Sequence, residues 1–363
     1  EDWYCIKMLT KPLEKSNINN ILIRATNWVG DAVMTLPALE AVRENFPSAS
    51  ITVLARPWVA PVFENHPAVN DLLIYRKHEA LIKNLSEIRR LIHVIRANRY
   101  DLAILFQNAF EAALLAYLGG VKSRLGFDSD GRGFLLTHGI KRTNELFAVH
   151  QVEYYLSILK AAGLKAESRN PVLHIAKNDF IKAGNLLMQN GISEDDFLLG
   201  LSPGAIFGNA KRWPAERFAK IGDLAAGKWN AKVIIMGSKK EKEIGTSMTG
   251  LMRHKPIDFC GTTSLGEAMG IIGRCNMFVT NDSGLMHIAA ALGVPTLAIF
   301  GSTDHVATGP RGATTRIIKH DIDCSPCLKP ECPTDFKCML SIETEEVWNE
   351  MEKLKQNRND PDK

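Results

Sequence analysis

Short apolar runs typical of β-strands alternate with helical patterns along almost the whole chain. A helix that links two parallel strands packs on the face of their sheet, so this alternation favours an α/β fold with parallel sheets. The predicted strands are Ile21–Ala25, Ser50–Ala55, Asp71–Tyr75 and Leu102–Phe106 in the first half, and Phe197–Ser202, Lys232–Met236, Met277–Thr280 and Thr296–Phe300 in the second. Helical stretches follow them, for example at 38–45 and 217–226, and a charged helix is predicted at 343–355.

The two series of strands are separated near residues 170–180, and a chain of 363 residues is long enough for two domains. We expect two doubly wound, Rossmann-like domains, at residues 20–175 and 176–363, with residues 1–19 as an N-terminal extension. Ligands of open parallel sheets bind at the carboxyl ends of the strands. The two domains are therefore expected to face a central cleft.

Basic residues are concentrated in one region of a chain whose formal net charge is only +4. The basic residues of this region are Arg76, Lys77, Lys83, Arg89, Arg90, Arg96 and Arg99, followed by Lys122, Arg124, Arg132, Lys141 and Arg142. A solvated helix face and a patch for an anionic ligand or a membrane surface explain them about equally well. No aromatic-interleaved basic motif accompanies them, which argues against a nucleic-acid partner.

The chain contains no uninterrupted apolar run near the roughly 20 residues that a membrane-spanning helix needs. The first residues are polar and lack the layout of a signal peptide. These observations predict a cytoplasmic location.

The stretch "TNWVGDAVMTLP", residues 26–37, lies where nucleotide-binding folds often carry a glycine-rich phosphate loop. It has one glycine, Gly30, followed directly by the carboxylate of Asp31. Asp31 could cap a helix or accept a proton from a substrate, and the residues alone favour neither. Proline is costly deep inside a helix, so Pro37 predicts a short turn around Asp31 and a regular helix only from about Thr35.

Three turns in the second half could hold a phosphate or a ribose. In "NDSGLMHIAAALG", Asp282 and Ser283 could cap a helix or leave its N–H groups to a phosphate, while Gly284 permits close approach. His287 in the same stretch could lie in the core, at the surface or toward a ligand.

In "LSPGAIFGNAKRWP" the candidates are Ser202, Gly204 and Lys211, and Pro214 is expected to open a helix. Lys211 could neutralise a pyrophosphate or be solvated, and in "MGSKKEKE" Glu241 or Glu243 could accept hydrogen bonds from a ribose.

Two further patterns resemble metal motifs. Asp128-Ser129-Asp130 and Asp321-Ile322-Asp323 match a D-x-D pattern, but Gly131 makes the first a turn, and neither is expected to bind metal. Four cysteines, Cys324, Cys327, Cys332 and Cys338, lie within one short stretch that starts as C-x2-C. Structural zinc sites more often separate two C-x2-C pairs by a longer segment. Reduced cysteines that pack a proline-rich loop are therefore favoured over a metal site, and a redox pair comes third.

Taken together, these segments resemble the heptosyltransferases of glycosyltransferase family 9, in the same order from about Asn20 to Leu340. The matching segments are "ILIRATNWVGDAVMTLPALEAVRENFP", "LFQNAFEAALLAYLGGVKSRLGF", "LSPGAIFGNAKRWP", "NDSGLMHIAAALGVPTLAIFGST" and "CSPCLKPECP…FKCM". The resemblance implies a GT-B fold and an inverting transfer from ADP-L-glycero-β-D-manno-heptose that needs no metal and no cofactor. The cysteine-rich stretch favours the members that add the second heptose. Their acceptor is the first heptose of the lipopolysaccharide inner core, on lipid A–Kdo2–heptose, at the cytoplasmic face of the inner membrane.

The resemblance also implies a role for individual residues. Asp31 would be the general base. The nucleotide-sugar donor would be held by Ser202, Gly204, Lys211, Glu241, Asp282, Ser283, Gly284, His287, Ser302 and Thr303. Two alternatives stay open: the same donor with a different acceptor, such as the lipid-linked core before its first heptose or a protein, and a nucleotide-sugar-binding protein without catalysis.

Overall fold

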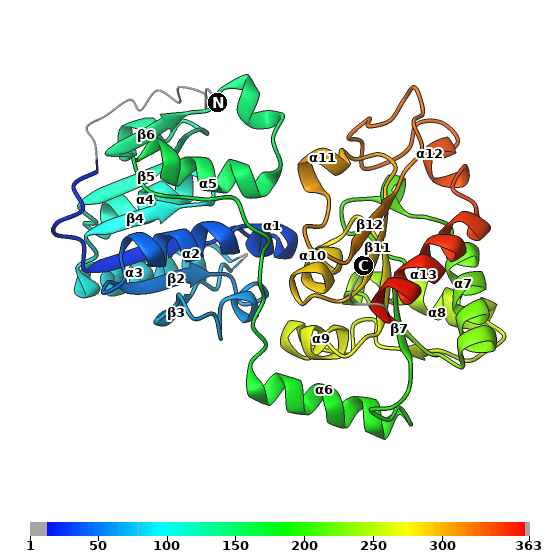
Figure 1. Cartoon of the computed structure of the whole chain (residues 1–363). Helices are drawn as coiled ribbons and strands as arrows, with labels where there is room; N and C mark the ends of the chain where they lie inside the picture. Colours follow the sequence, from blue (N-terminus) through cyan, green and yellow to red (C-terminus); the bar gives the residue numbers. More distant parts are fainter. Residues whose placement is uncertain (1–12, 79, 360–363) are drawn as a thin grey trace. The chain divides into compact units, whose positions relative to one another are not determined.

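The computed structural model describes residues 13–78 and 80–359, and the chain forms two compact units (Figure 1). The division falls between Arg169 and Asn170, slightly before the predicted boundary at 175. We call the two parts unit 1 and unit 2. Most of the predicted extension, residues 1–12, lies outside the described residues.

Unit 1 is built on a six-stranded parallel sheet with the strand order β3-β2-β1-β4-β5-β6. The strands are β1 Asn20–Arg24, β2 Ser50–Ala55, β3 Asp71–Ile74, β4 Leu102–Leu105, β5 Ser123–Asp128 and β6 His138–Lys141. The four predicted strands are confirmed to within one residue. The last two were missed, because β5 begins with polar residues and contains Gly126, and β6 has a single large apolar residue, Ile140.

Helices cover the sheet of unit 1, and the side chains of its central strand are almost fully buried. The helices are α1 Val29–Met34, α2 Leu36–Asn45, α3 Leu81–Asn98, α4 Phe110–Leu118 and α5 Gln151–Ala161. Short 3-10 helices occur at η1 Ala60–Val62, η2 Gly133–Leu135 and η3 Asn144–Phe147.

Unit 2 repeats the same winding in its own parallel sheet, with the order β12-β11-β10-β7-β8-β9. The strands are β7 Leu198–Ser202, β8 Lys232–Ile235, β9 Ile257–Asp258, β10 Met277–Asn281, β11 Thr296–Ile299 and β12 Thr315–Ile318. The four predicted strands are again confirmed to within one residue. The edge strands β9 and β12 were missed, since they are short and contain Asp258 and Arg316.

The helices of unit 2 agree with the predicted ones where the sequence was periodic. They are α6 Lys177–Gln189, α7 Ala215–Trp229, α8 Lys242–Leu251, α9 Leu265–Ile272, α10 Gly284–Ala291, α11 His305–Thr308, α12 Lys337–Leu340 and α13 Thr344–Asn359, with 3-10 helices η4 Asn209–Lys211 and η5 Lys239–Glu241. Pro214 is the residue that precedes α7 rather than its first residue. The charged C-terminal helix begins one residue later than predicted and extends to Asn359.

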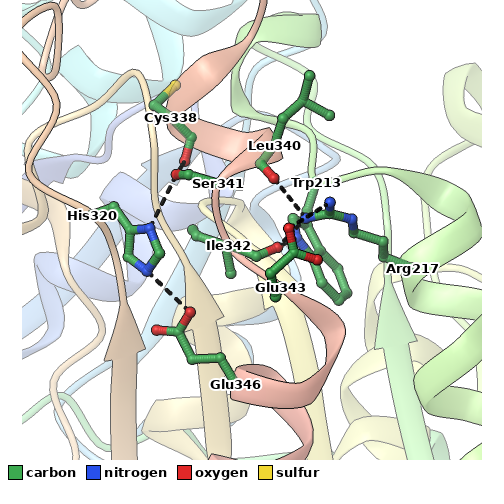
Figure 2. A network of polar contacts seen from close by, with 9 residues as sticks. All are labelled: Trp213, Arg217, His320, Cys338, Leu340, Ser341, Ile342, Glu343 and Glu346. Atoms are coloured by element: carbon green, nitrogen blue, oxygen red, sulfur yellow. Dashed lines mark hydrogen bonds and ion pairs between the residues drawn. The ribbon is translucent and has the colours of Figure 1, made fainter.

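A polar network connects the residues that lead into α13 with the start of α7 (Figure 2). The indole N–H of the fully buried Trp213 donates to the carbonyl of Ile342 at 2.9 Å. Arg217 donates to the carbonyl of Leu340 at 2.8 Å and forms an ion pair of 3.1 Å with Glu343. His320, which follows β12, contacts Glu346 of α13, with 3.0 Å between Nε2 and Oε2. This network fixes the segment that leads into α7.

In the described part of the chain, no helix has both the length and the apolar character needed to cross a bilayer.

Candidate functional site

In a sheet of this order, the chain turns to opposite sides after two neighbouring central strands, and the gap between those turns is the usual ligand position. In unit 1 the two strands are β1 and β4, which pair directly. In unit 2 they are β7 and β10, which also pair directly. Asp31 follows β1, while Lys211 and Asp282 follow β7 and β10. Three predicted site residues therefore lie at the two switch points.

Asp31 lies in the first turn of helix α1. Trp28 occupies the N-cap position, and no side chain caps this helix. The Asp31 carboxylate accepts a hydrogen bond from the phenol of Tyr155, with 3.2 Å between Oη and Oδ1. The N-cap alternative for Asp31 is thus not what the structure shows.

The regular helix predicted from about Thr35 is confirmed as α2, whereas the short turn predicted around Asp31 is itself a short helix. Residues 29–34 form α1, and a second helix, α2, begins at Leu36 after a break at Thr35. Pro37 is the second residue of α2, where its missing N–H has no helical partner to lose. The Thr35 hydroxyl donates to the carbonyl of Ala32 at 2.7 Å and closes the first helix. The proline therefore separates two helices instead of delaying one.

Tyr155 comes from α5 and is buried behind Asp31. Burial, followed by the negative charge of Asp31, holds the pKa of the phenol well above its usual value of 10. The ring packs edge-on against Phe106, with 5.8 Å between the ring centroids. Tyr155 is therefore a fixed, neutral donor that orients the Asp31 carboxylate.

Two exposed tryptophans, Trp28 and Trp58, belong to or contact the segment that leads into α1. Trp28 is 63% exposed and Trp58 is 55% exposed, which is unusual for so large an apolar side chain. The indole N–H of Trp58 donates to the carbonyl of Asn27 at 2.9 Å, and Arg24 donates to the Asn27 side chain at 2.9 Å. These bonds tie Trp58 to the segment that leads into α1.

In unit 2, Lys211 and Asp282 form a close ion pair. Lys211 ends η4 rather than lying in an open loop, and its Nζ is 2.6 Å from Oδ2 of Asp282. The hydroxyl of Thr303 donates to the same oxygen at 2.7 Å. The two charged side chains are only 13% and 6% exposed, and Phe207 lies 4.8 Å below the ammonium. The lysine is therefore partly buried and neutralised within unit 2.

Ser283 and Asp282 play different parts at the start of α10. Ser283 is the N-cap, and its hydroxyl accepts from the backbone N–H of Met286 at 3.4 Å. Asp282 caps nothing here, because its carboxylate holds Lys211 and Thr303. Gly284 is the first residue of the helix, and His287 is buried within it. The helix N-terminus thus directs its remaining N–H groups toward the Lys211 side of the sheet.

Glu241 lies against the turn after β7. One carboxylate oxygen accepts from both the backbone N–H and the hydroxyl of Ser238, each at 2.7 Å. The other oxygen occupies the position that a Cβ on Gly204 would need, so a side chain there would displace the Glu241 carboxylate. Ser202 ends β7 and is buried, whereas Glu243 is exposed in α8. Of the two ribose candidates, Glu241 is the one that faces this turn.

Comparison with known proteins identifies the family of the chain. The family description "Glycosyltransferase family 9 (heptosyltransferase)" matches residues 88–337, more than half of the sequence. The chain is 30% identical over 311 residues to lipopolysaccharide heptosyltransferase 2 of Escherichia coli K12, covering 82% of this chain and 87% of that protein.

The chain belongs to glycosyltransferase family 9.

Two further matches extend the likeness to nearly full length. Lipooligosaccharide heptosyltransferase 2 of Campylobacter jejuni strain 81116 is 30% identical over 341 residues, covering 92% of this chain and 98% of that one. The solved structure of E. coli ADP-heptose LPS heptosyltransferase II superposes with a TM-score of 0.80 at 27% identity, covering 94% and 99% of the two chains. The two parallel six-stranded sheets of this family 9 member thus match the GT-B fold, as the sequence predicted.

The four clustered cysteines of this family 9 member lie in the loop between β12 and α12, residues 319–336, and at the start of α12; we call residues 319–336 the cysteine loop. All four are free thiols, and together with Ser302 they line a cavity of about 80 Å³. The Ser302 hydroxyl is buried there without a hydrogen-bond partner among the described residues. Among those residues, no three histidine, cysteine or acidic side chains are grouped so as to hold a metal ion.

The cysteine loop braces two turns of the site. The backbone N–H of Leu328 donates to the carbonyl of Ser302 at 2.7 Å, after β11. The backbone N–H of Ala210, next to Lys211, donates to the carbonyl of Pro330 at 3.1 Å. A Cβ on Gly208 would collide with that same carbonyl group. The loop is thus part of the support of Lys211 and Thr303.

The first D-x-D pattern forms the turn that the sequence predicted. Asp130 and Gly131 adopt positive φ angles of 52° and 69°, as a tight turn requires. In the second pattern, Asp321 pairs with Lys319 at 2.8 Å.

Sequence reasoning missed two residues that organise the site. Tyr155 lies 124 residues from Asp31, so no local pattern connects them. Asn281 is fully buried; its amide donates to the carbonyl of Pro203 at 2.7 Å and accepts from the N–H of Trp213 at 3.0 Å. A signal for Asn281 was available, because a polar residue directly before Asp282 ends an otherwise apolar strand.

Proposed function

We propose that this protein transfers L-glycero-D-manno-heptose from ADP-L-glycero-β-D-manno-heptose to the first heptose of the lipopolysaccharide inner core, with inversion. The observation that carries this proposal is the 30% identity to heptosyltransferase 2 proteins over more than four fifths of the chain. The residues at the two switch points supply the chemistry that such a transfer needs. Unit 1 would bind the acceptor and unit 2 the nucleotide sugar.

In the proposed reaction, the acceptor hydroxyl attacks the anomeric carbon on the face opposite the nucleotide. A new carbon–oxygen bond forms, the bond to the diphosphate breaks, and ADP leaves with the electron pair. The hydroxyl proton passes to Asp31, which Tyr155 holds in position. A carboxylate is too weak a base to remove this proton beforehand, so transfer occurs late, as the new bond forms, and contributes about 10²–10⁴ in rate.

Unit 2 would stabilise the departing diphosphate. Lys211 would supply a positive charge for which the diphosphate competes with Asp282, and the N-terminus of α10 would supply N–H groups and the positive end of the helix dipole. Gly204 and Glu241 shape the neighbouring turn for the nucleoside. The proposed mechanism needs neither a metal nor a cofactor, because these groups meet the charge of the leaving group.

The acceptor places the enzyme at a membrane. Lipid A anchors the inner core, so we propose that the protein works in the cytoplasm as a peripheral protein on the inner membrane. The exposed rings of Trp28 and Trp58 beside Asp31 are suited to the apolar face of an acceptor sugar.

The test is incubation of the purified protein with ADP-heptose and three acceptors: lipid A–Kdo2, lipid A–Kdo2–heptose and an acceptor peptide. We expect the product mass to increase by one heptose on the second acceptor only, with one ADP released per transfer. Transfer only to lipid A–Kdo2 or to the peptide would contradict the acceptor assignment. Binding of ADP-heptose without any release of ADP would instead support the non-catalytic alternative.

A further inference from the structure

One side of helix α4 in unit 1 exposes large apolar side chains. Phe110, Tyr117 and Leu118 are 40%, 50% and 37% exposed. Phe134, in the neighbouring η2, is 77% exposed, and its ring centroid lies 6.2 Å from that of Phe110. We call these four residues the α4 face.

The α4 face is distinct from the side of the helix that packs in the core. Ala112, Ala113, Leu115 and Ala116 are buried beneath it. Positions 110, 117 and 118 follow helical spacing and form a stripe along the opposite side. A helix that is apolar on both sides has more apolar surface than unit 1 covers, and exposed patches of this kind mark interaction sites.

Basic groups border the α4 face. Arg96 donates to the carbonyl of Leu118 at 2.7 Å, and the Arg124 guanidinium lies 5.3 Å from the centre of the Tyr117 ring. Lys122 is 75% exposed on its side chain, although it also pairs with Asp101. The acidic residue of the helix itself, Glu111, lies seven residues before Leu118 and is bonded by Tyr75 and Lys77. Basic groups therefore border the Tyr117 and Leu118 end of the α4 face, whereas the exposed Asp128 lies against Gly133, next to Phe134.

We propose that the α4 face docks on the surface of an anionic phospholipid bilayer. Aromatic rings favour the interface between lipid and water, and neighbouring arginines attract anionic headgroups. The helix starts directly after β4, at the same carboxyl edge of the sheet from which Asp31 follows β1. The proposal deepens the proposed function, on which it rests for its partner, because a lipid-anchored acceptor would then reach unit 1 from the docked surface.

The first test is co-sedimentation of the full chain with vesicles of phosphatidylcholine containing phosphatidylglycerol. We expect binding that falls with added salt, and a decrease of about tenfold in partitioning for the double variant Phe110→Ser/Phe134→Ser. The matched control is Ile181→Ser/Met188→Ser, which removes two exposed apolar side chains from α6 in unit 2 and should bind as the parent does. Equal melting temperatures of the parent and both variants would show that the fold is retained.

The second test separates docking from chemistry. The Phe110→Ser/Phe134→Ser variant should retain parental transfer to a soluble, delipidated core and lose about tenfold on an acceptor embedded in vesicles. Unchanged vesicle binding by this variant, or no vesicle binding by the parent, would overturn the docking proposal. If vesicle binding depends on the α4 face but no acceptor receives a heptose, the proposed function is contradicted. The docking proposal is then still supported.

Discussion

The two units share one strand order, yet they surround the acidic residue at the switch point differently. In unit 1, Asp31 meets the neutral phenol of Tyr155. In unit 2, Asp282 meets the ammonium of Lys211 and the hydroxyl of Thr303. The same topology therefore places a carboxylate in both sheets, and its neighbours decide what that carboxylate can do. Asp31 keeps its charge and is the proton acceptor in the proposed reaction, while Asp282 holds a lysine.

This difference shows why fold alone does not specify chemistry. A hydroxyl donor fixes a carboxylate in place without cancelling its charge. A lysine cancels the charge and is itself held, so a diphosphate has to compete with Asp282 for it. The contrast predicts that substitutions in unit 1 change turnover and substitutions in unit 2 change nucleotide affinity.

The largest expected effect comes from replacing the proposed base. Asp31→Asn keeps the size of the side chain and removes its capacity to take a proton, so transfer should fall by about 10²–10⁴-fold. ADP affinity, measured by calorimetry, should stay the same, because the nucleotide is assigned to unit 2. Asp71→Asn, at an exposed residue that opens β3, serves as the control. Turnover within a few-fold of the parent would rule Asp31 out as the base.

The next effect tests the ion pair of unit 2. Lys211→Ala should weaken ADP binding by roughly 10- to 100-fold, as expected for a lost hydrogen bond to a charged group. It should also lower the free energy of unfolding by about 3 kcal/mol, because the buried Asp282 loses its cation.

A double variant separates those two consequences. Lys211→Ala/Asp282→Asn removes both charges, so stability in denaturant titrations should largely recover while ADP affinity stays low. Lys220→Ala, at an exposed lysine of α7, is the matched control. Parental ADP affinity in the Lys211→Ala variant would remove the lysine from the site.

A smaller effect is expected from the residue that orients Asp31. Tyr155→Phe removes one hydrogen bond to a carboxylate and should lower kcat by roughly tenfold. The adjacent Tyr154→Phe is the control, since the Tyr154 phenol accepts from Asn108 at 2.8 Å instead. The pKa of Tyr155 is raised well above 10, so its phenol keeps its proton up to at least pH 10. The ratio of the kcat of the parent to that of Tyr155→Phe should therefore not change with pH below 10. A ratio that changes between pH 6 and 9 would contradict this role.

The smallest expected effect is a difference in thiol reactivity between Cys332, in the cysteine loop, and Cys338, in α12. Hydrogen bonds from Thr334 and then from backbone N–H groups lower the pKa of the Cys332 thiol, whereas burial and then the neighbouring thiols raise that of Cys338. A lower pKa means more thiolate at a given pH, so iodoacetamide should modify Cys332 several-fold faster than Cys338 at pH 7.5. The difference between the two modification rates should decrease as the pH rises, and peptide mass spectrometry can measure both rates. Faster modification of Cys338 would show that the loop opens to solvent.

The sequence could predict what depends on neighbours along the chain. Eight strands were located to within one residue, because each is an apolar run between turn signals, and all but β3 consist mainly of buried side chains. Strands β9 and β12 escaped notice because edge strands are short and half exposed. Asp31 was identified as a candidate, but Pro37 misled the local prediction, since a proline in the first turn of a second helix resembles one that delays a single helix.

What depends on pairs of distant residues could not be predicted from one sequence. The contact between Lys211 and Asp282 exists because β7 and β10 are neighbours in the sheet, 71 residues apart in the chain. The contact between Tyr155 and Asp31 requires α5 to return to the start of α1. Neither pairing leaves a periodicity or a spacing that a single sequence reveals.

The cysteine loop has a consequence for the timing of the catalytic cycle. Its backbone is bonded both to Ser302, next to Thr303, and to Ala210, next to Lys211. A nucleotide held by these residues would be released only when two turns loosen, and the same loop restrains both. In many enzymes product release rather than chemistry limits kcat. In the proposed reaction, one loop therefore restrains both turns assigned to the nucleotide.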